Sequence, residues 1–145
     1  MRGRRRGTPD QDRWERSDWW GVVLDSPDPK ALARFYSGLL GWPLWRPEEM
    51  DAGEAAIDAG DGVVGITFHL KEDYVRPVWP NTPGEQQQMM HLDFEVSDLA
   101  EATAHAVELG AELVAHQPQD DVRVLLDPDG HPFCLYAHTP AAAPE

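Results

Sequence analysis

The stretch HLDFEVSDLAEATAHAVELG, residues 91–110, carries the pattern that decides the fold. Polar and apolar side chains alternate in its first half, which is typical of a strand with one buried face. His91, Asp93 and Glu95 share one face, and Leu92, Phe94 and Val96 share the other. Asp98 then suits an N-cap, apolar residues follow at helical spacing, and Gly110 suits a helix end. The stretch predicts a strand, a tight turn and a helix, with a histidine and two acids on the strand face opposite the helix.

An earlier stretch repeats this pattern. Residues 21–28, GVVLDSPD, correspond position by position to residues 91–98. Asp28 again suits the N-cap, Pro29 takes the first helical position, where no N–H is needed, and Gly41 suits the helix end. Repetition at about half the chain length predicts two copies of one module. Each copy is expected to contain a strand, a helix and three further strands.

The later strands of the two copies are also expected to match. The triplet FHL at 68–70 resembles FCL at 133–135, which aligns His69 with Cys134. Alternation and turn residues predict the remaining elements. The expected strands are 42–45, 55–58, 63–70, 112–116, 122–126 and 132–136, with turns at 59–62 and 127–130.

Charge and cysteine content limit the classes of function. The chain has 145 residues and a formal net charge of −14, although residues 1–16 hold six arginines against three acids. An acidic body argues against a nucleic-acid partner, because phosphate binding needs a basic face. No apolar run follows the arginines and none is long enough to span a membrane. One cysteine, Cys134, excludes an internal disulfide and favours a cytoplasmic protein.

The same reasoning predicts one folded domain between two disordered tails. The proline-rich connector between its modules carries Tyr74, Val78 and Trp79, so it is expected to pack on something. The predicted boundaries are a basic tail at 1–16, one domain at 17–138 and a tail at 139–145. Within the domain, module 1 covers about 17–71, the connector 72–89 and module 2 about 90–138.

Several short motifs, in this order and spacing, resemble the vicinal oxygen chelate superfamily. That superfamily includes glyoxalase I, bleomycin-resistance proteins, fosfomycin-resistance enzymes and extradiol dioxygenases. The motifs are DP at 28–29, FY at 35–36, LG at 40–41, HLD at 91–93, and DPDG at 127–130 with Phe133. FH at 68–69, TPG at 82–84 and FCL at 133–135 are similar to its glyoxalase-like branch. The resemblance covers about residues 19–137.

This resemblance implies an α+β fold of two pseudo-symmetric βαβββ modules, whose curved mixed sheet surrounds a cleft. Combined with the alternation, it implies which side chains face the helices and which face the cleft. Leu92, Phe94, Val96, Ile66, Phe68, Phe133 and Leu135 are expected beneath the helices. His91, Asp93, Glu95, Thr67, His69, Cys134 and Tyr136 are expected in the cleft. The predicted ligand-binding residues are Thr67, His69, His91, Cys134, Tyr136 and Trp42.

The resemblance also raises the question of a metal. Metal-dependent relatives place ligands at positions that correspond to Gly21, His69, His91 and Cys134. Glycine has no ligand atom, and cysteine replaces the hard carboxylate that Mg²⁺, Mn²⁺ or Fe²⁺ prefers. His69, His91 and Cys134 could still hold Zn²⁺ or another divalent metal with water in a fourth place. The favoured interpretation is that no cofactor is bound, with Cys134 a small apolar wall residue and His91 a hydrogen-bonding one.

Catalysis without a metal would rely on His91, with Asp93 and Glu95 as neighbouring acids that tune or orient it. The alternative is that these acids lie at a solvent-exposed rim or bind loop amides, which is the commoner role. Trp42, Trp45 and Trp79 could line a cleft for a flat ligand or bury a subunit contact. Since these aromatic residues lie outside the expected core, a C2 homodimer is the default assembly.

The sequence therefore predicts a glyoxalase-like protein that binds a small molecule, either to sequester it or to transform it. The alternative is a metal-dependent lyase or isomerase of the glyoxalase I type that uses His69, His91 and Cys134. Fold does not decide between these functions.

Overall fold

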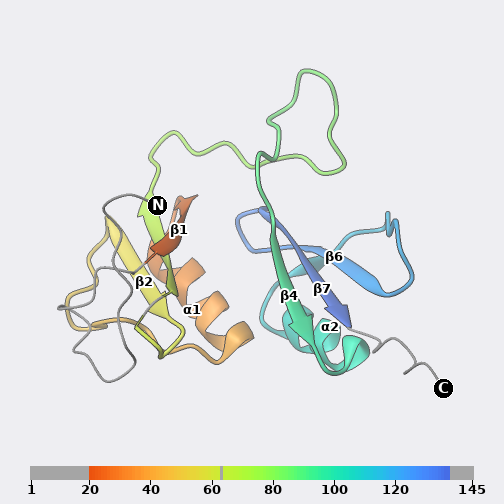
Figure 1. Cartoon of the computed structure of the whole chain (residues 1–145). Helices are drawn as coiled ribbons and strands as arrows, with labels where there is room; N and C mark the ends of the chain where they lie inside the picture. The colour runs from red at the N-terminus through yellow and green to blue at the C-terminus, as the bar shows by residue number, and fades with distance from the viewer. Residues whose placement is uncertain (1–19, 63, 138–145) are drawn as a thin grey trace, which may run out of the picture. The chain divides into compact units, whose positions relative to one another are not determined.

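A computed structural model describes residues 20–62 and 64–137, which divide between Tyr74 and Val75 into two compact units (Figure 1). The expected tails at 1–16 and 139–145 lie outside the described residues. Neither helix in the described part of the chain has the length and apolar character that a membrane crossing requires.

The first unit is a three-stranded sheet with one helix. Its elements are β1 (Trp20–Ser26), α1 (Pro29–Leu40), β2 (Glu54–Asp58) and β3 (Val64–Leu70). The strand order is β1-β3-β2, with β1 parallel and β2 antiparallel to β3. Tyr36 of α1 stacks on Phe68 of β3 with 5.6 Å between ring centroids, and both side chains are fully buried. The aromatic residues of the helix thus hold it against the sheet.

The predicted ends of α1 are confirmed. The Asp28 carboxylate accepts a hydrogen bond from the Ala31 amide at 3.1 Å, and Pro29 occupies the first turn. Gly41 ends the helix in the left-handed conformation at φ 69°, and its amide donates to the Ser37 carbonyl at 2.9 Å. An L side chain is disfavoured in that conformation, which explains the glycine.

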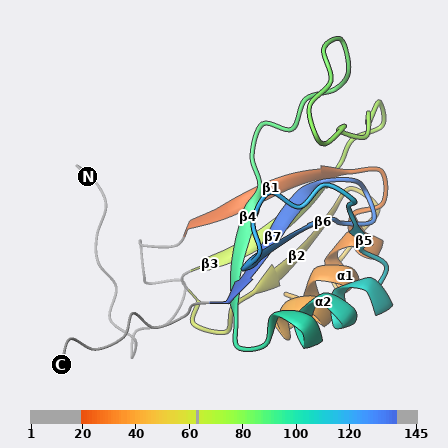
Figure 2. The same cartoon turned by 90° about the vertical axis from the view of Figure 1, so that its right-hand side faces the viewer.

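The second unit has the same plan with one more strand. Its elements are β4 (Leu92–Val96), α2 (Leu99–Glu108), β5 (Glu112–Leu113), β6 (Val122–Leu126) and β7 (Pro132–Ala137), in the order β4-β7-β6-β5. Asp98 caps α2 by accepting from the Glu101 amide at 2.9 Å, as predicted. Figure 2 shows α2 against one face of its sheet. On β7 the alternate residues Phe133 and Leu135 are buried, as expected for the helix side.

The repeat is confirmed in the topology of the two units, but the predicted match of His69 with Cys134 is wrong. Counted from the two caps, Val23 corresponds to Asp93; Val23 pairs with Thr67, whereas Asp93 pairs with Cys134. Thr67, not His69, is therefore the counterpart of Cys134. A slip of two residues preserves which face a side chain occupies, so alternation alone could not detect it.

Two predicted strands are shorter than expected. Residues 42–45 form only an isolated bridge, Leu44 to Ile57, beside a Pro43 that has no N–H to donate. The strand predicted at 112–116 is reduced to Glu112–Leu113, because the Gln117 side chain takes the place of backbone hydrogen bonds beyond it. Its amide donates to the carbonyls of Val114 and Val124 and accepts from the Val124 N–H, at 2.8–2.9 Å.

The turn at 127–130 is organised by a buried carboxylate. Asp127 is 1% exposed. One of its oxygens accepts from the amides of Asp129 and His131, and the other lies 2.8 Å from His131 Nδ1. The turn returns the chain from β6 to β7 and fixes where β7 begins.

Candidate functional site

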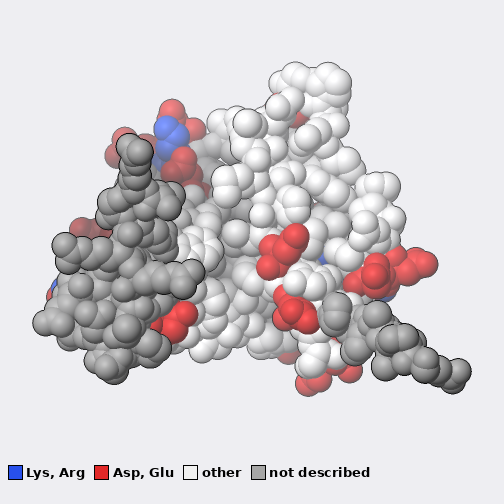
Figure 3. All heavy atoms as spheres, in the orientation of Figure 1, with Lys and Arg blue, Asp and Glu red and all other residues white. Residues whose placement is uncertain are grey.

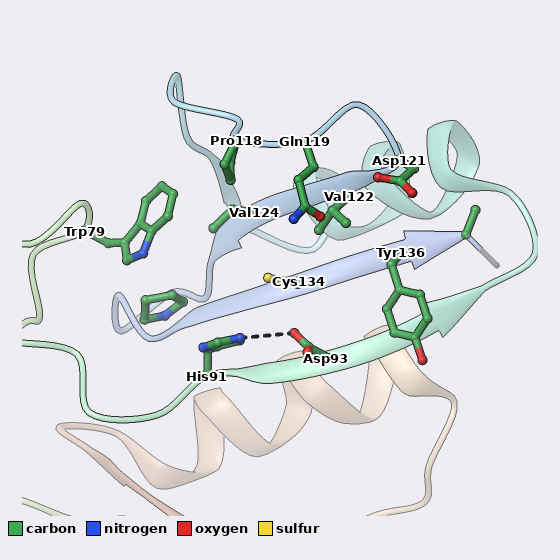
Figure 4. A pocket seen from close by; sticks show the side chains of 12 residues that line it. Trp79, His91, Asp93, Pro118, Gln119, Asp121, Val122, Val124, Cys134 and Tyr136 are labelled. Atoms are coloured by element: carbon green, nitrogen blue, oxygen red, sulfur yellow. Dashed lines mark ion pairs between the residues drawn. The ribbon is translucent and has the colours of Figure 1, made fainter. Parts of the chain in front are cut away.

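A cavity of about 470 Å³ opens on the face of the second sheet that α2 does not cover (Figure 4). Its floor comes from three neighbouring strands, since Asp93 of β4 pairs with Cys134 of β7, which pairs with Val124 of β6. The cavity is lined by Trp79, His91, Asp93, Pro118, Gln119, Asp121, Val122, Val124, Pro132, Cys134, Tyr136 and Ala137.

One wall comes from the connector. Trp79 packs against the small apolar cluster of Val114, Val124 and Leu126, and its ring centroid lies 5.8 Å from that of His116. Figure 4 shows the indole at one end of the cavity, beyond His91. The connector, expected to pack on something, thus contributes a broad aromatic surface to the site.

The connector is anchored beside this wall by Arg76. Its guanidinium donates to the Pro128 carbonyl at 2.7 Å and lies 3.6 Å from the Glu112 carboxylate. Gly130 lies directly under the arginine, since an added Cβ would come within 2.5 Å of Arg76 Cγ. Gly130 also has φ 92°, where an L side chain is strained. The glycine of the DPDG turn therefore leaves space for Arg76, the residue that anchors the connector.

The polar side of the cavity is centred on His91. Its Nε2 lies 3.4 Å from Asp93 Oδ1, and its Nδ1 lies 3.2 Å from the Gln88 side-chain nitrogen. When Gln88 donates to Nδ1, neutral His91 carries its proton on Nε2, facing Asp93. Both side chains are about half exposed, at 49% and 56%. They can therefore reorient toward a ligand.

Cys134 forms the middle of the floor. Burial raises the pKa of its thiol to about 11, with further contributions from a hydrogen bond to Asp93 and from the Asp93 charge. The group is therefore a neutral thiol near pH 7 and a poor nucleophile. This agrees with its expected role as a small wall residue.

His91, Asp93 and Cys134 also form a possible metal site. One ligand atom from each lies within 4.8 Å of the others. An imidazole, a carboxylate and a thiolate are ligands that Zn²⁺ accepts, so the donor set fits this ion. The predicted set differed, because it contained His69 and lacked Asp93. His69 belongs to the first unit, where its Nε2 lies 2.9 Å from a Glu54 carboxylate oxygen.

The structure gathers only part of the predicted site. His91, Asp93, Cys134 and Tyr136 line the cavity together, whereas Glu95, two residues beyond Asp93 on β4, is not among its lining residues. Thr67, His69 and Trp42 belong to the first unit.

Sequence reasoning missed the rim formed by Pro118, Gln119, Asp121 and Val122, since it treated residues 118–121 as a polar turn. The alternation in β6 contained a signal for Val122 and Val124, since it places them on the face that carries Cys134. Nothing comparable pointed to Asp121, which precedes the strand. For Trp79, lining of a cleft was one of two interpretations, and its position in the cavity favours that one.

Comparison with known proteins gives a consistent picture. Residues 21–136 match the model of a family described as a glyoxalase-like domain. The anthracycline biosynthesis protein DnrV of Streptomyces peucetius is 29% identical over 121 residues, covering 78% of this chain and 44% of DnrV. DauV of Streptomyces sp. strain C5, also described as an anthracycline biosynthesis protein, is 28% identical with the same coverage. The chain thus spans less than half the length of these curated relatives.

Solved structures with low sequence identity share the fold. A glyoxalase/bleomycin resistance protein/dioxygenase family enzyme from Burkholderia phytofirmans has a TM-score of 0.60 at 21% identity, covering 81% of this chain and 95% of its own. The fosfomycin resistance protein FosX from Mesorhizobium loti has a TM-score of 0.59 at 15% identity, covering 83% of this chain and 92% of its own. The bleomycin resistance determinant of transposon Tn5 has a TM-score of 0.54 at 22% identity, covering 83% of this chain and 98% of its own.

Proposed function

Because the chain belongs to the glyoxalase-like domain family, we propose that it binds a small organic molecule in the cavity of its second unit. The observation that carries this proposal is the cavity itself. A volume of about 470 Å³ falls in the range of about 300–1,000 Å³ usual for ligand pockets. An apolar lining with a few convergent polar groups is also usual for such pockets.

Two relatives take part in anthracycline biosynthesis, so polycyclic aromatic compounds are the first ligands to test. Trp79 offers a flat apolar surface on which such a ring system can stack. We expect anthraquinone derivatives to bind, and Trp79→Ala to weaken binding about tenfold, which corresponds to a stacking contribution of about 1.4 kcal/mol.

Isothermal titration calorimetry measures this effect. Trp45→Ala is the matched control, because Trp45 is a partly exposed tryptophan of the first unit that does not line the cavity. Equal affinities for wild type and Trp79→Ala would contradict the proposed binding site.

A chemical step in this cavity would rely on His91. A neutral imidazole can accept a proton from a bound ligand at Nδ1, the nitrogen that otherwise accepts from Gln88, and the Asp93 carboxylate beside Nε2–H would stabilise the imidazolium that forms. General base catalysis of this kind contributes about 10²- to 10⁴-fold in rate. Glu95, outside the cavity lining, is proposed to have no direct part in this step.

The second candidate is a metal-dependent lyase or isomerase, favoured by the convergence of His91, Asp93 and Cys134. A bound divalent ion would act as a Lewis acid on a substrate oxygen. The three residues would hold it, and Cys134 would lose its proton on binding, so zinc affinity should rise with pH. Metal analysis after dialysis separates the candidates. Stoichiometric zinc that His91→Ala and Asp93→Asn remove, and that Asp120→Asn retains, would support the metal-dependent enzyme.

We also propose a homodimer and a cytoplasmic location. The free thiol of Cys134 suits a reducing compartment. Exposed apolar side chains at the two ends of the connector support self-association. Val75 is 62%, Met89 82% and Met90 64% exposed.

A further inference from the structure

The ionisable groups that line the cavity are unevenly distributed in sign. Asp93 and Asp121 contribute carboxylates, and none of the lining residues is a lysine or an arginine. Asp93 lies on β4 and Asp121 immediately precedes β6, so they approach the cavity from opposite sides of β7. Figure 4 shows the two carboxylates on either side of Cys134 and Tyr136. A positive group above β7 would therefore meet a carboxylate from each side.

Besides His91, which lies 3.4 Å from Asp93, the cavity has two arginines close to its lining in the sequence, and both have other partners. Arg123 alternates with the lining residues Val122 and Val124, and its guanidinium donates to the carbonyls of Asp120 and Val122. Arg76 is held by the Pro128 carbonyl. Neither residue is positioned to neutralise Asp121, whose carboxylate has no side-chain partner within the described residues.

The charge of the surrounding protein has the same sign. Residues 20–137 contain six lysines and arginines against 21 aspartates and glutamates. On the face drawn in Figure 3, acidic side chains predominate over basic ones. Such a field attracts cations and repels anions over distances of about 10 Å at 0.1 M salt.

The broadest apolar side chain of the lining, Trp79, lies at the opposite end of the cavity from Asp121. In Figure 4, Trp79 and Pro118 occupy one end of the cavity, whereas Asp121 and Tyr136 occupy the other. The cavity is thus suited to a molecule whose flat apolar body and charged group are at different ends. A phosphate or carboxylate ligand would face two like charges.

We propose that the ligand of this cavity is an organic cation, a protonated amine carried on a planar apolar ring system. Its rings lie against Trp79, and its ammonium group lies between Asp93 and Asp121. This inference rests on the proposed function and adds the charge of the ligand to it.

Three anthracene derivatives that differ in charge provide the test. They are 9-(aminomethyl)anthracene, 9-anthracenemethanol and 9-anthracenecarboxylate, and their own fluorescence reports binding to the full-length protein. The amine is expected to bind more tightly than the alcohol, and the carboxylate most weakly. Raising the salt concentration should weaken binding of the amine and leave that of the alcohol unchanged.

Two conservative variants locate the effect. Asp121→Asn should weaken binding of the amine about fivefold, equivalent to about 1 kcal/mol for a partly exposed ion pair, and leave the alcohol unaffected. Asp120→Asn makes the same change of charge one residue away, outside the cavity lining, and should leave both affinities unchanged.

The outcomes separate this inference from the function on which it rests. If the alcohol binds as tightly as the amine, or if both variants have equal effects, the preference for a cation is wrong and the binding site stands. If none of the three compounds binds, or if Trp79→Ala leaves all three affinities unchanged, the binding site itself is wrong. A preference for the amine that Asp121→Asn alone reduces confirms the inference.

Discussion

At the scale of single residues, one carboxylate of the cavity, Asp93, affects the chemistry of its neighbours. Asp93 lies beside His91 and also accepts from the Cys134 thiol, so one carboxylate is shared by an imidazole and a thiol. Its negative charge disfavours a thiolate at Cys134. The carboxylate that lies beside His91 therefore also keeps Cys134 unreactive.

This coupling predicts how Cys134 reacts with iodoacetamide. Since the chain has a single cysteine, the reaction reports one site. The alkylation rate should keep rising with pH until about 11, the pKa of the folded thiol. Asp93→Asn should lower that pKa, though not to the ordinary value of 9.0, because burial is the largest cause. Asp120→Asn is the control and should change nothing; a wild-type midpoint near 9 would contradict the argument.

The same pKa sets the sign of a stability effect. The folded thiol holds its proton up to about pH 11, whereas an exposed thiol loses it near 9.0. Between these values the folded state binds more protons than the unfolded state, so the free energy of unfolding falls as the pH rises. Cys134→Ala should remove this part of the alkaline decrease, which thermal melts at pH 8 and pH 10 would show.

The site could be predicted from the sequence only where it lies on regular strands. His91, Cys134 and Tyr136 were expected to face a cleft because alternation assigns each to one face of its strand. Asp121 was not predicted as a site residue because it belongs to a turn, where no periodicity indicates the direction of a side chain. The alignment of His69 with Cys134 was wrong for a related reason: it needed the register between strands that are distant in the sequence, which composition does not fix.

At the scale of elements, the connector and the DPDG turn depend on each other. Arg76 crosses over Gly130, and Trp79, three residues later, completes the cavity wall. The turn thus positions a wall of the site although it does not line the cavity. A change in the turn should therefore affect ligand binding as well as stability.

Gly130→Ala tests this dependence. The new methyl group would collide with Arg76 and would also sit at a positive φ. The collision and the backbone strain together should lower the free energy of unfolding by about 2–3 kcal/mol and weaken ligand binding. Gly84→Ala is a matched control, because Gly84 lies in the connector at φ 89° with nothing within 4 Å of an added Cβ. It should cost only the strain, about 1 kcal/mol.

Chemical denaturation and ligand titration of both variants provide the measurement. If Gly130→Ala and Gly84→Ala lose the same stability and retain the same affinity, Arg76 does not couple the turn to the cavity.

At the scale of the whole molecule, the repeat was predictable and its details were not. The two aspartate caps and the glycine that ends α1 are local signals, and each marks an end of its helix. The shortening of the strand at 112–116 was not predicted, because the Gln117 side chain, which follows that strand, takes the place of backbone hydrogen bonds. Whether a side chain takes over backbone hydrogen bonds depends on tertiary contacts, which a local sequence pattern does not indicate.

Exposed methionines predict that the protein self-associates. Met89 and Met90 expose 82% and 64% of their surface, which water disfavours unless another copy covers them. We expect sedimentation at about twice 16.2 kDa. Glutamate at both positions should shift the protein to monomer without unfolding it. Val107→Glu, at a 46% exposed position on α2, is the control and should remain dimeric. A wild type that sediments as a monomer at high micromolar concentration would contradict the dimer.

The register of the two units has a consequence for the design of variants. Where the second unit has His91, Asp93 and Cys134, the first has Gly21, Val23 and Thr67. The two units therefore share one scaffold and differ in chemistry at these three positions. The first unit keeps the strands and the helix but has no imidazole, carboxylate or thiol at these three positions. The side chains of His91, Asp93 and Cys134 can therefore be introduced at Gly21, Val23 and Thr67, one position at a time.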